Sequence, residues 1–171
     1  GFDGLANYSK IKLSNIIIKN IVLKLLYNLK ITIVNQDHII PSLIKRKNIL
    51  KILNNSKLIK TNFNIRDIFA AGTIGGKKKS RSEFIDNILS SDYTFCYRGA
   101  ANYSLRFYET LCLGRIPLFV DTDCKLPFEK EIDWKSICIW VNKDDIEYIP
   151  ELILDFHNSH SESKFIEKQM Y

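Results

Sequence analysis

The chain has 171 residues, 46% of them apolar, a composition that supports one globular domain with a full hydrophobic core. No stretch approaches the roughly 20 uninterrupted apolar residues of a membrane span, because Lys19 and Lys24 interrupt the most apolar run. The net charge of +6 is uneven: residues 1–82 hold 16 Lys and Arg against 3 Asp and Glu, whereas residues 83–171 hold 9 against 16. A first half at +13 is typical of proteins with an anionic partner, and it also follows from a composition rich in Lys, Ile and Asn.

The opening residues GFDG predict the end of a strand and a tight turn, so a partner domain is expected upstream of this single-domain chain (1–171). Apolar residues at helical spacing predict a helix over residues 10–29, and a short strand is expected at 31–34. Pro41 opens a second predicted helix over 42–56, with a buried stripe of Leu43, Ile44, Leu50 and Leu53.

The middle of the chain carries its most prominent predicted loop, the glycine-rich and basic segment 70–82, after an alternating segment at 58–65 that predicts a strand. The sequence GTIGGKKKS in this loop does not meet the spacing of a P-loop. The elements predicted beyond it are a helix at 82–91, a strand at 93–97, a helix from Ser104 to Gly114, strands at 116–120 and 136–141, and two amphipathic helices at the end. This alternation predicts an α/β fold with a mainly parallel sheet covered on both faces.

The four cysteines form no Cys-x-x-Cys pair, and Cys96, Cys112 and Cys138 lie in apolar segments. They are therefore interpreted as buried, reduced thiols, which favours a reducing compartment and a cytoplasmic location. His157 and His160 have no nearby residues to complete a zinc site and are interpreted as polar residues at a helix end, so no metal site is predicted.

A candidate anion site lies in the turn between the strand at 93–97 and the helix that begins at Ser104. Ligands of open parallel sheets bind where strands end and helices begin, and Gly99 allows a ligand to approach the backbone there. Ser104 is a favoured N-cap residue, and the amide groups of a helix N-terminus bind anions. Arg106 in the first turn opposes the helix dipole, unless an anion lies between Arg106, Arg98 and the helix N-terminus.

A diphosphate suits this arrangement because guanidinium groups bind phosphate oxygens in pairs. Glu109, one turn deeper, can accept hydrogen bonds from the hydroxyls of a ribose, so the set describes a nucleoside diphosphate pocket. The alternative is that Arg106 and Glu109 form an ordinary i,i+3 ion pair worth a few tenths of a kcal/mol.

The motifs S-D-Y, C-x-R-G, N-x-S-x-R-F-Y-E, G-R-I-P and L-P-F followed by I-D-W occur in order between residues 91 and 134. With their surroundings, from about residue 43 to 160, they resemble the exostosin-like glycosyltransferases of family 47. The resemblance is closer to the shorter exostosin-type proteins of bacteria and large viruses. It implies the C-terminal, Rossmann-like, three-layer half of a GT-B fold, with an N-terminal acceptor domain missing from this chain.

The resemblance implies roles for single residues. Arg98 and Gly99 lie at the donor pocket, Ser104 and Arg106 face the diphosphate, and Glu109 binds ribose or sugar hydroxyls. Asn102 joins the pocket, Arg66 meets the phosphates from the other side, and Gly4 leaves room near the donor. The segments 126–128 and 133–134 are expected to hold the following loop in place.

The implied activity is transfer of a sugar from a UDP- or GDP-sugar to a glycan acceptor with inversion, with no cofactor or metal required. The general base is expected from the N-terminal domain, because Asp3, Asp121 and Asp123 are interpreted as turn or capping residues. One alternative is a module that binds nucleotide sugars without turnover. A nucleic-acid binder is disfavoured because the aromatic residues of the basic half are scattered. A Golgi or membrane-associated location would follow from an upstream anchor.

Overall fold

The computed structural model describes residues 13–32, 39–64, 74–99 and 102–159, and its centre is a parallel β-sheet. The strands β1 (Tyr93–Cys96), β2 (Ile116–Val120) and β3 (Ile139–Val141) lie side by side in that order. In the register, Phe95 is opposite Leu118 and Leu118 is opposite Ile139. The predicted α/β fold with a parallel sheet is confirmed.

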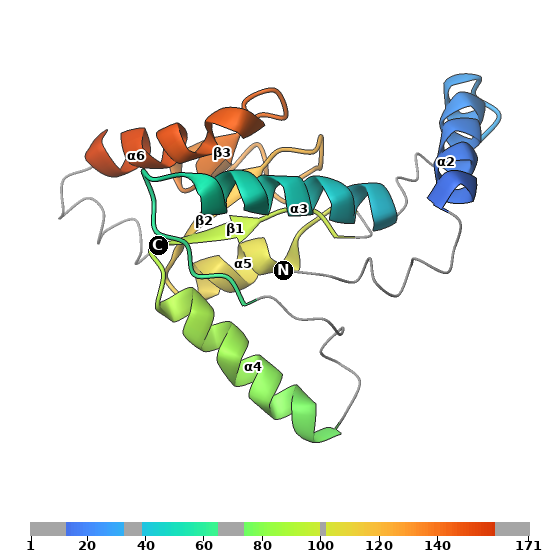
Figure 1. Cartoon of the computed structure of the whole chain (residues 1–171). Helices are drawn as coiled ribbons and strands as arrows, with labels where there is room; N and C mark the ends of the chain where they lie inside the picture. Colours follow the sequence, from blue (N-terminus) through green and yellow to red (C-terminus); the bar gives the residue numbers. More distant parts are fainter. Residues whose placement is uncertain (1–12, 33–38, 65–73, 100–101, 160–171) are drawn as a thin grey trace.

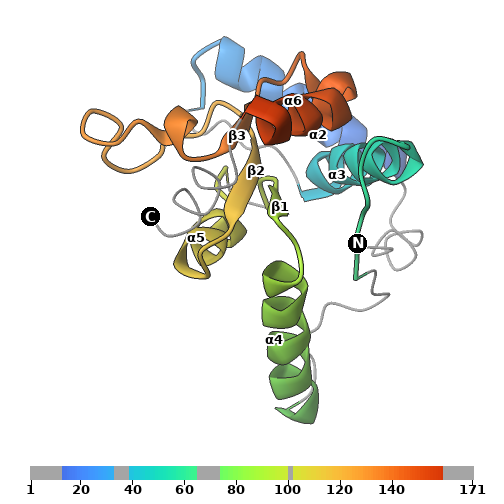
Figure 2. The ribbon, with the colours of Figure 1, turned by 90° about the vertical axis from the view of Figure 1, so that its left-hand side faces the viewer.

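Helices cover both faces of the sheet and produce three layers (Figures 1 and 2). Helices α3 (Ile39–Asn55) and α6 (Ile149–Ser159) lie on one face, and α5 (Leu105–Cys112) lies on the other. Side chains alternate along each strand, so Leu118 belongs to the cluster under α3 and α6, whereas Phe119 packs against α5. The three layers are those expected of a Rossmann-like domain.

The two core clusters explain why these segments fold together. The larger cluster buries aliphatic residues of all three strands against α3 and α6; its members are Ile49, Leu53, Phe95, Tyr97, Ile116, Leu118, Val120, Ile139, Val141, Ile149 and Ile153. The smaller cluster lies under α5 and comprises Cys96, Phe107, Phe119, Leu126 and Cys138. Phe107 is fully buried and contacts the rings of Phe119 and Trp134 at centroid distances of 5.0 and 5.5 Å.

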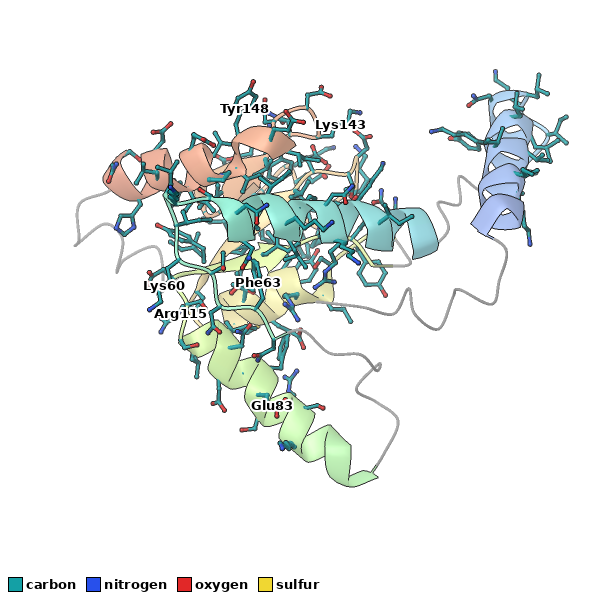
Figure 3. The ribbon with its side chains drawn as sticks, in the orientation of Figure 1. Lys60, Phe63, Glu83, Arg115, Lys143 and Tyr148 are labelled. Carbon is teal, nitrogen blue, oxygen red and sulfur yellow. The ribbon has the colours of Figure 1, made fainter. Side chains whose placement is uncertain are left out.

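The predicted basic loop over 70–82 is wrong for its described part, because α4 (Ile74–Leu89) is a continuous helix from residue 74 onward. This helix extends away from the sheet, and its carboxyl end lies beside the body of the domain (Figures 1 and 2). Arg115 donates from Nη2 to the carbonyl of Leu89 at 2.9 Å, which ties that end to the start of β2 (Figure 3). The Lys, Arg and Glu residues of the segment have good intrinsic helix propensity, which outweighs its two glycines.

The strand predicted over 58–65 is also wrong, because residues 58–64 are described and contain no strand. Ile59 and Phe63 of this segment are half-buried and pack against the larger core cluster. The alternation of apolar and polar residues in this segment therefore indicates which side chains face the core. It does not indicate that the segment pairs with a strand of the sheet.

The first predicted helix is confirmed as α2 (Leu13–Asn28). Its apolar side chains Ile18, Leu25 and Leu29 are 58%, 55% and 65% exposed. Figure 1 shows the reason, since α2 stands to one side of the sheet and its covering helices. Of the strand expected at 31–34, residues 31 and 32 are not in a strand and the remainder lies outside the described residues.

The second helix, α3, begins two residues before Pro41, which therefore occupies the first turn, where proline is tolerated. Of its predicted stripe, Leu53 is buried and Leu50 and Ile44 are half-buried, and Ile49 is buried in addition. The side chain of Leu43 lies outside the described residues.

Two further short elements, η1 (Trp134–Ser136) and η2 (Ile146–Tyr148), flank β3. Trp134 donates from Nε1 to the carbonyl of Pro127 at 2.8 Å, and Leu126 is buried, so these residues hold the loop after β2 as expected. Phe128 differs, because its side chain is 69% exposed. Within the described residues, none of the helices is both long and apolar enough to cross a membrane.

The cysteine prediction holds for Cys96 and Cys138, which are buried free thiols. Cys112 is exposed, so its predicted burial is wrong, because it lies on the outer side of the last turn of α5. His157 lies in the last turn of α6, where its Nδ1 is 2.9 Å from the hydroxyl of Tyr93.

Candidate nucleotide site at the carboxyl edge of the sheet

The three parallel strands end at the same edge of the sheet. Residues 97–99 follow β1, residues 121–124 follow β2 and residues 142–145 follow β3. The amide of Asp121 donates to the carbonyl of Val141 at 2.8 Å, which continues the pairing of β2 and β3 to this edge. Ligands of open parallel sheets bind at this edge, so the candidate residues after β1 lie in the expected place.

The turn after β1 is fixed from two sides. The hydroxyl of Ser42, on the first turns of α3, donates to the carbonyls of Arg98 and Gly99 at 3.2 and 3.1 Å. The side chain of Asn102 donates to the carbonyl of Thr122 at 3.0 Å, and the hydroxyl of Thr122 donates back to Asn102 Oδ1 at 2.8 Å. Asn102 therefore connects the turn after β1 to the loop after β2.

Gly99 lies in this turn with open space beside its backbone. A Cβ atom built on Gly99 has no heavy atom of the described residues within 4 Å, and its φ lies outside the left-handed region. Neither crowding nor backbone conformation therefore requires a glycine at this position in the free protein. The open backbone allows close approach of a ligand, as the sequence predicts.

Ser104 occupies the N-cap position of α5, as predicted, with φ −125° and ψ 110°. Its side chain is buried, and its hydroxyl makes no capping hydrogen bond. Within α5, the hydroxyl of Thr110 donates to the carbonyl of Arg106 at 2.6 Å. The first turn of α5 thus begins at the candidate site without a side-chain cap from Ser104.

Arg106 has an aromatic partner on α4. Its guanidinium carbon lies 4.9 Å from the ring centroid of Phe84, and the guanidinium carbon of Arg81 lies 5.4 Å from the same centroid. Such contacts are worth about 0.5–1 kcal/mol at partly exposed positions. The ring of Phe84 therefore offsets the unfavourable position of Arg106 in the first turn of a helix, even before any anion is bound.

Glu109 also contacts α4. Its Oε1 accepts a hydrogen bond from Nη1 of Arg81 at 2.8 Å, in an ion pair that remains partly open to solvent. Glu109 therefore pairs with Arg81 of α4. The alternative interpretation had paired Glu109 with Arg106 of its own helix. Two candidate donor-binding residues, Arg106 and Glu109, are engaged by α4 in the free protein.

The sequence did not single out Arg46, an arginine of α3 that lies at the same site. Its pKa is lowered to about 10, first by burial and then by the positive charge of Arg106. Its Nε atom is buried and has no hydrogen-bond partner within the described part of the chain. The available signal was its spacing, because Arg46 precedes the buried Ile49 and Leu53 by three and seven residues on one helix face.

Cys96, a buried residue of β1 near Arg106 and Arg46, adds no charge to the site. Burial raises the pKa of the Cys96 thiol to about 12, and the hydrogen bond between Cys96 and Thr110 and the charges of Arg106 and Arg46 oppose that rise. Cys96 is therefore a protonated thiol at neutral pH, and it adds no negative charge beside the arginines. Its Sγ lies 3.9 Å from the hydroxyl of Thr110.

Arg98 is half-buried at the end of β1, close enough to the loop after β2 to influence Cys124. Burial is the main cause that raises the pKa of Cys124, and Arg98 acts in the opposite direction. Arg66 and Gly4, predicted at the same pocket, lie outside the described residues, as does Asp3.

The two aspartates of the loop after β2 behave as the turn residues they were interpreted to be. Asp121 Oδ1 accepts a hydrogen bond from the amide of Asp123 at 2.8 Å. Asp123 has φ 57° and forms an ion pair with Lys143 at 3.3 Å. Among the described residues, no group of three or more His, Cys, Asp or Glu side chains is placed to hold a metal ion.

A parallel sheet between helices, with arginines and an open glycine backbone at its carboxyl edge, defines a Rossmann-like α/β domain. The exostosin GT47 domain matches residues 41–155, and the chain belongs to this family. The match includes most of α3, the whole sheet and most of α6, and therefore every described residue of the candidate site.

Curated relatives share the same region. The chain is 37% identical to exostosin-1 of Drosophila melanogaster over 67 residues, or 38% of this chain and 9% of that protein. It is 36% identical to an exostosin-1 homolog of Caenorhabditis elegans over 74 residues, 43% of this chain and 19% of the relative. A probable glucuronosyltransferase of Oryza sativa subsp. japonica is 30% identical over 79 residues, 46% of this chain and 18% of the relative.

The chain thus spans less than a fifth of the length of each of these relatives. No solved structure matches the chain.

Proposed function

We propose that this chain is the donor-binding domain of a glycosyltransferase that takes its sugar from a UDP- or GDP-sugar. Membership of the exostosin GT47 family supports the proposal, as does the name of the rice relative, a probable glucuronosyltransferase. The observation that carries it is the combination of Arg98, Arg106 and the open backbone of Gly99 at the carboxyl edge of the sheet.

In the proposed reaction, a hydroxyl oxygen of a glycan acceptor attacks the anomeric carbon and inverts it. The bond between that carbon and the diphosphate oxygen breaks, and its electron pair leaves with the nucleoside diphosphate. Arg98, Arg106 and the N-terminus of α5 stabilise the charge that develops on the diphosphate, without a metal or cofactor. The hydroxyl proton passes to a general base that the proposal assigns to an N-terminal acceptor domain.

Glu109 has a separate role in the proposal, because a carboxylate can accept hydrogen bonds from both hydroxyls of a ribose. The hydrogen bond from Arg81 goes to Oε1 of Glu109. A ribose would therefore bind through Oε2, or it would displace Arg81. Asn102 would hold the turn after β1 in place through its two hydrogen bonds with Thr122.

The test is a calorimetric titration of the chain with UDP and GDP, repeated on Arg106→Ala. We expect a Kd at least tenfold weaker for the variant, because a charge-assisted contact with phosphate contributes about 1.5–3 kcal/mol. Lys51→Ala is the matched control, since Lys51 is an exposed cation on the far half of α3, and its effect should stay within twofold. Equal affinities of Arg106→Ala and the wild type would remove Arg106 from the donor site.

The non-catalytic alternative shares this donor site, so titration does not separate the two. An assay of donor hydrolysis and sugar transfer by a protein that includes the N-terminal domain does. Release of UDP or GDP that depends on Arg106 supports the transferase, whereas tight donor binding without turnover supports the binding module.

A further inference from the structure

Four described residues of α3, namely Ser42, Arg46, Ile49 and Leu53, stand at helical spacing on one face, and Arg46 is the charged member of this row. Ser42, Ile49 and Leu53 are all buried, and Arg46 stands among them at helical spacing. Ser42, one turn before Arg46, donates to the carbonyls of Arg98 and Gly99. Arg46 therefore lies where α3 passes from the turn after β1 to the hydrophobic core.

The surroundings of Arg46 do not compensate its charge within the described structure. Its Nε atom is buried and has no hydrogen-bond partner there. The charged groups that influence it are Arg106, of the same sign, and Cys96, whose thiol is neutral at physiological pH. A half-buried guanidinium with an enclosed Nε atom is unfavourable beside another guanidinium in the free protein, and an anion between them reverses that balance.

We infer that Arg46 is a third arginine of the diphosphate site, which acts from α3 together with Arg106 from α5. The inference rests on the proposed function and adds a binding residue to it. The Nε–H of Arg46 is a buried donor with a fixed direction, and a guanidinium offers such donors in a planar fork that matches phosphate oxygens. The hydrogen bonds of Ser42 hold the start of α3 against the turn and so position Arg46.

The test compares Arg46→Met with Lys45→Met, which removes the same charge from the neighbouring, exposed position of α3. Each protein is titrated by calorimetry with UDP, with inorganic pyrophosphate and with uridine. We expect Arg46→Met to weaken UDP and pyrophosphate at least tenfold and to leave uridine within twofold of the wild type. Lys45→Met should leave all three within twofold.

Thermal unfolding without ligand separates a binding role from a structural one. Because Arg46→Met removes a buried cation next to Arg106, its unfolding midpoint should equal or exceed that of the wild type. Arg46→Lys keeps the charge but loses the planar fork, and its UDP affinity should fall by several fold. A lower midpoint for Arg46→Met, combined with wild-type UDP affinity in Arg46→Lys, would assign Arg46 to structure and overturn the inference.

The inference and the proposed function can fail separately. If the wild type binds UDP or GDP and Arg46→Met binds it equally well, Arg46 is excluded and the donor site stands on Arg98 and Arg106. If the wild type binds neither nucleotide nor pyrophosphate, the proposed function and the inference both fall.

Discussion

The free structure does not explain why residue 99 is a glycine, because a methyl group there would meet no heavy atom of the described residues and would need no left-handed backbone. Gly114 is the opposite case. Its φ of 63° places it in the left-handed region after α5, where its amide and that of Arg115 donate to the carbonyls of Leu111 and Thr110. The two glycines therefore allow a matched comparison.

We expect Gly99→Ala to leave the free energy of unfolding unchanged or to raise it by about 0.5 kcal/mol, through a less flexible unfolded chain. The same substitution should weaken UDP binding by several fold, because the added methyl group occupies space that the donor needs. Gly114→Ala should cost about 1 kcal/mol of stability and leave UDP affinity within twofold. Urea unfolding and calorimetry measure both quantities, and unchanged UDP affinity in Gly99→Ala would contradict close approach at Gly99.

Because Cys96 is a buried thiol, we expect the free energy of unfolding to fall at alkaline pH. Burial raises its pKa from about 9 to about 12, so the folded protein holds the thiol proton more tightly than the unfolded chain. The stabilisation is complete below about pH 9 and is lost as the pH rises from 9 toward 12. Each pH unit in this window should remove up to about 1.4 kcal/mol.

The measurement is urea unfolding at several pH values between 8 and about 11. Cys96→Ala should be less stable than the wild type at pH 8, since it leaves a small cavity, and the difference should shrink above about pH 9. A difference that stays constant with pH would mean that Cys96 does not control the titration.

At the scale of elements, the contact between α4 and α5 was missed by sequence reasoning, because the glycines and lysines of 74–79 resemble a loop. Local composition does not reveal that Phe84 and Arg81 meet Arg106 and Glu109 in the folded chain. The strand–turn–helix pattern placed Arg98, Gly99 and Ser104 at the carboxyl edge, since that pattern is local. Arg46 required a contact between α3 and a turn about 50 residues later, as the Ser42 hydrogen bonds show.

The stacking of two arginines on Phe84 predicts a measurable coupling. Phe84→Leu should lower the free energy of unfolding by about 1 kcal/mol, because it removes both cation–π contacts. In the Arg106→Ala background the same change should cost about 0.5 kcal/mol less, and urea unfolding of the four proteins in this cycle measures the difference.

Tyr148→Leu provides a control for loss of a surface aromatic. Tyr148 is the last residue of η2, is 62% exposed and lies on the opposite side of the domain from α4 (Figure 3). Its substitution should stay within about 0.5 kcal/mol. Full additivity of Phe84→Leu and Arg106→Ala would show that the contact between Phe84 and Arg106 contributes nothing to stability.

At the scale of the whole molecule, the excess of positive charge in residues 1–82 is divided among separate helices. Basic residues of this half lie on α2, α3 and α4. Figure 1 shows that α2 stands to one side, and Figures 1 and 2 show that α4 extends away from the sheet. The division of the described cations among three helices does not favour one continuous basic surface. A protein that binds single-stranded nucleic acid combines such a surface with stacking aromatic residues.

This separation predicts weak, salt-sensitive binding of a single-stranded oligonucleotide, with a Kd in the non-specific range of about 10⁻⁴–10⁻⁶ M at physiological salt. Because the described arginines of the proposed diphosphate site, Arg46, Arg98 and Arg106, lie apart from the lysines of α2, an excess of oligonucleotide should not displace bound UDP in a fluorescence competition assay. Lys19→Gln on α2 should weaken the oligonucleotide slightly and leave UDP unchanged, whereas Arg106→Ala should do the reverse. Tight oligonucleotide binding that survives 0.2 M salt and competes with UDP would place nucleic acid at the site assigned to the sugar nucleotide.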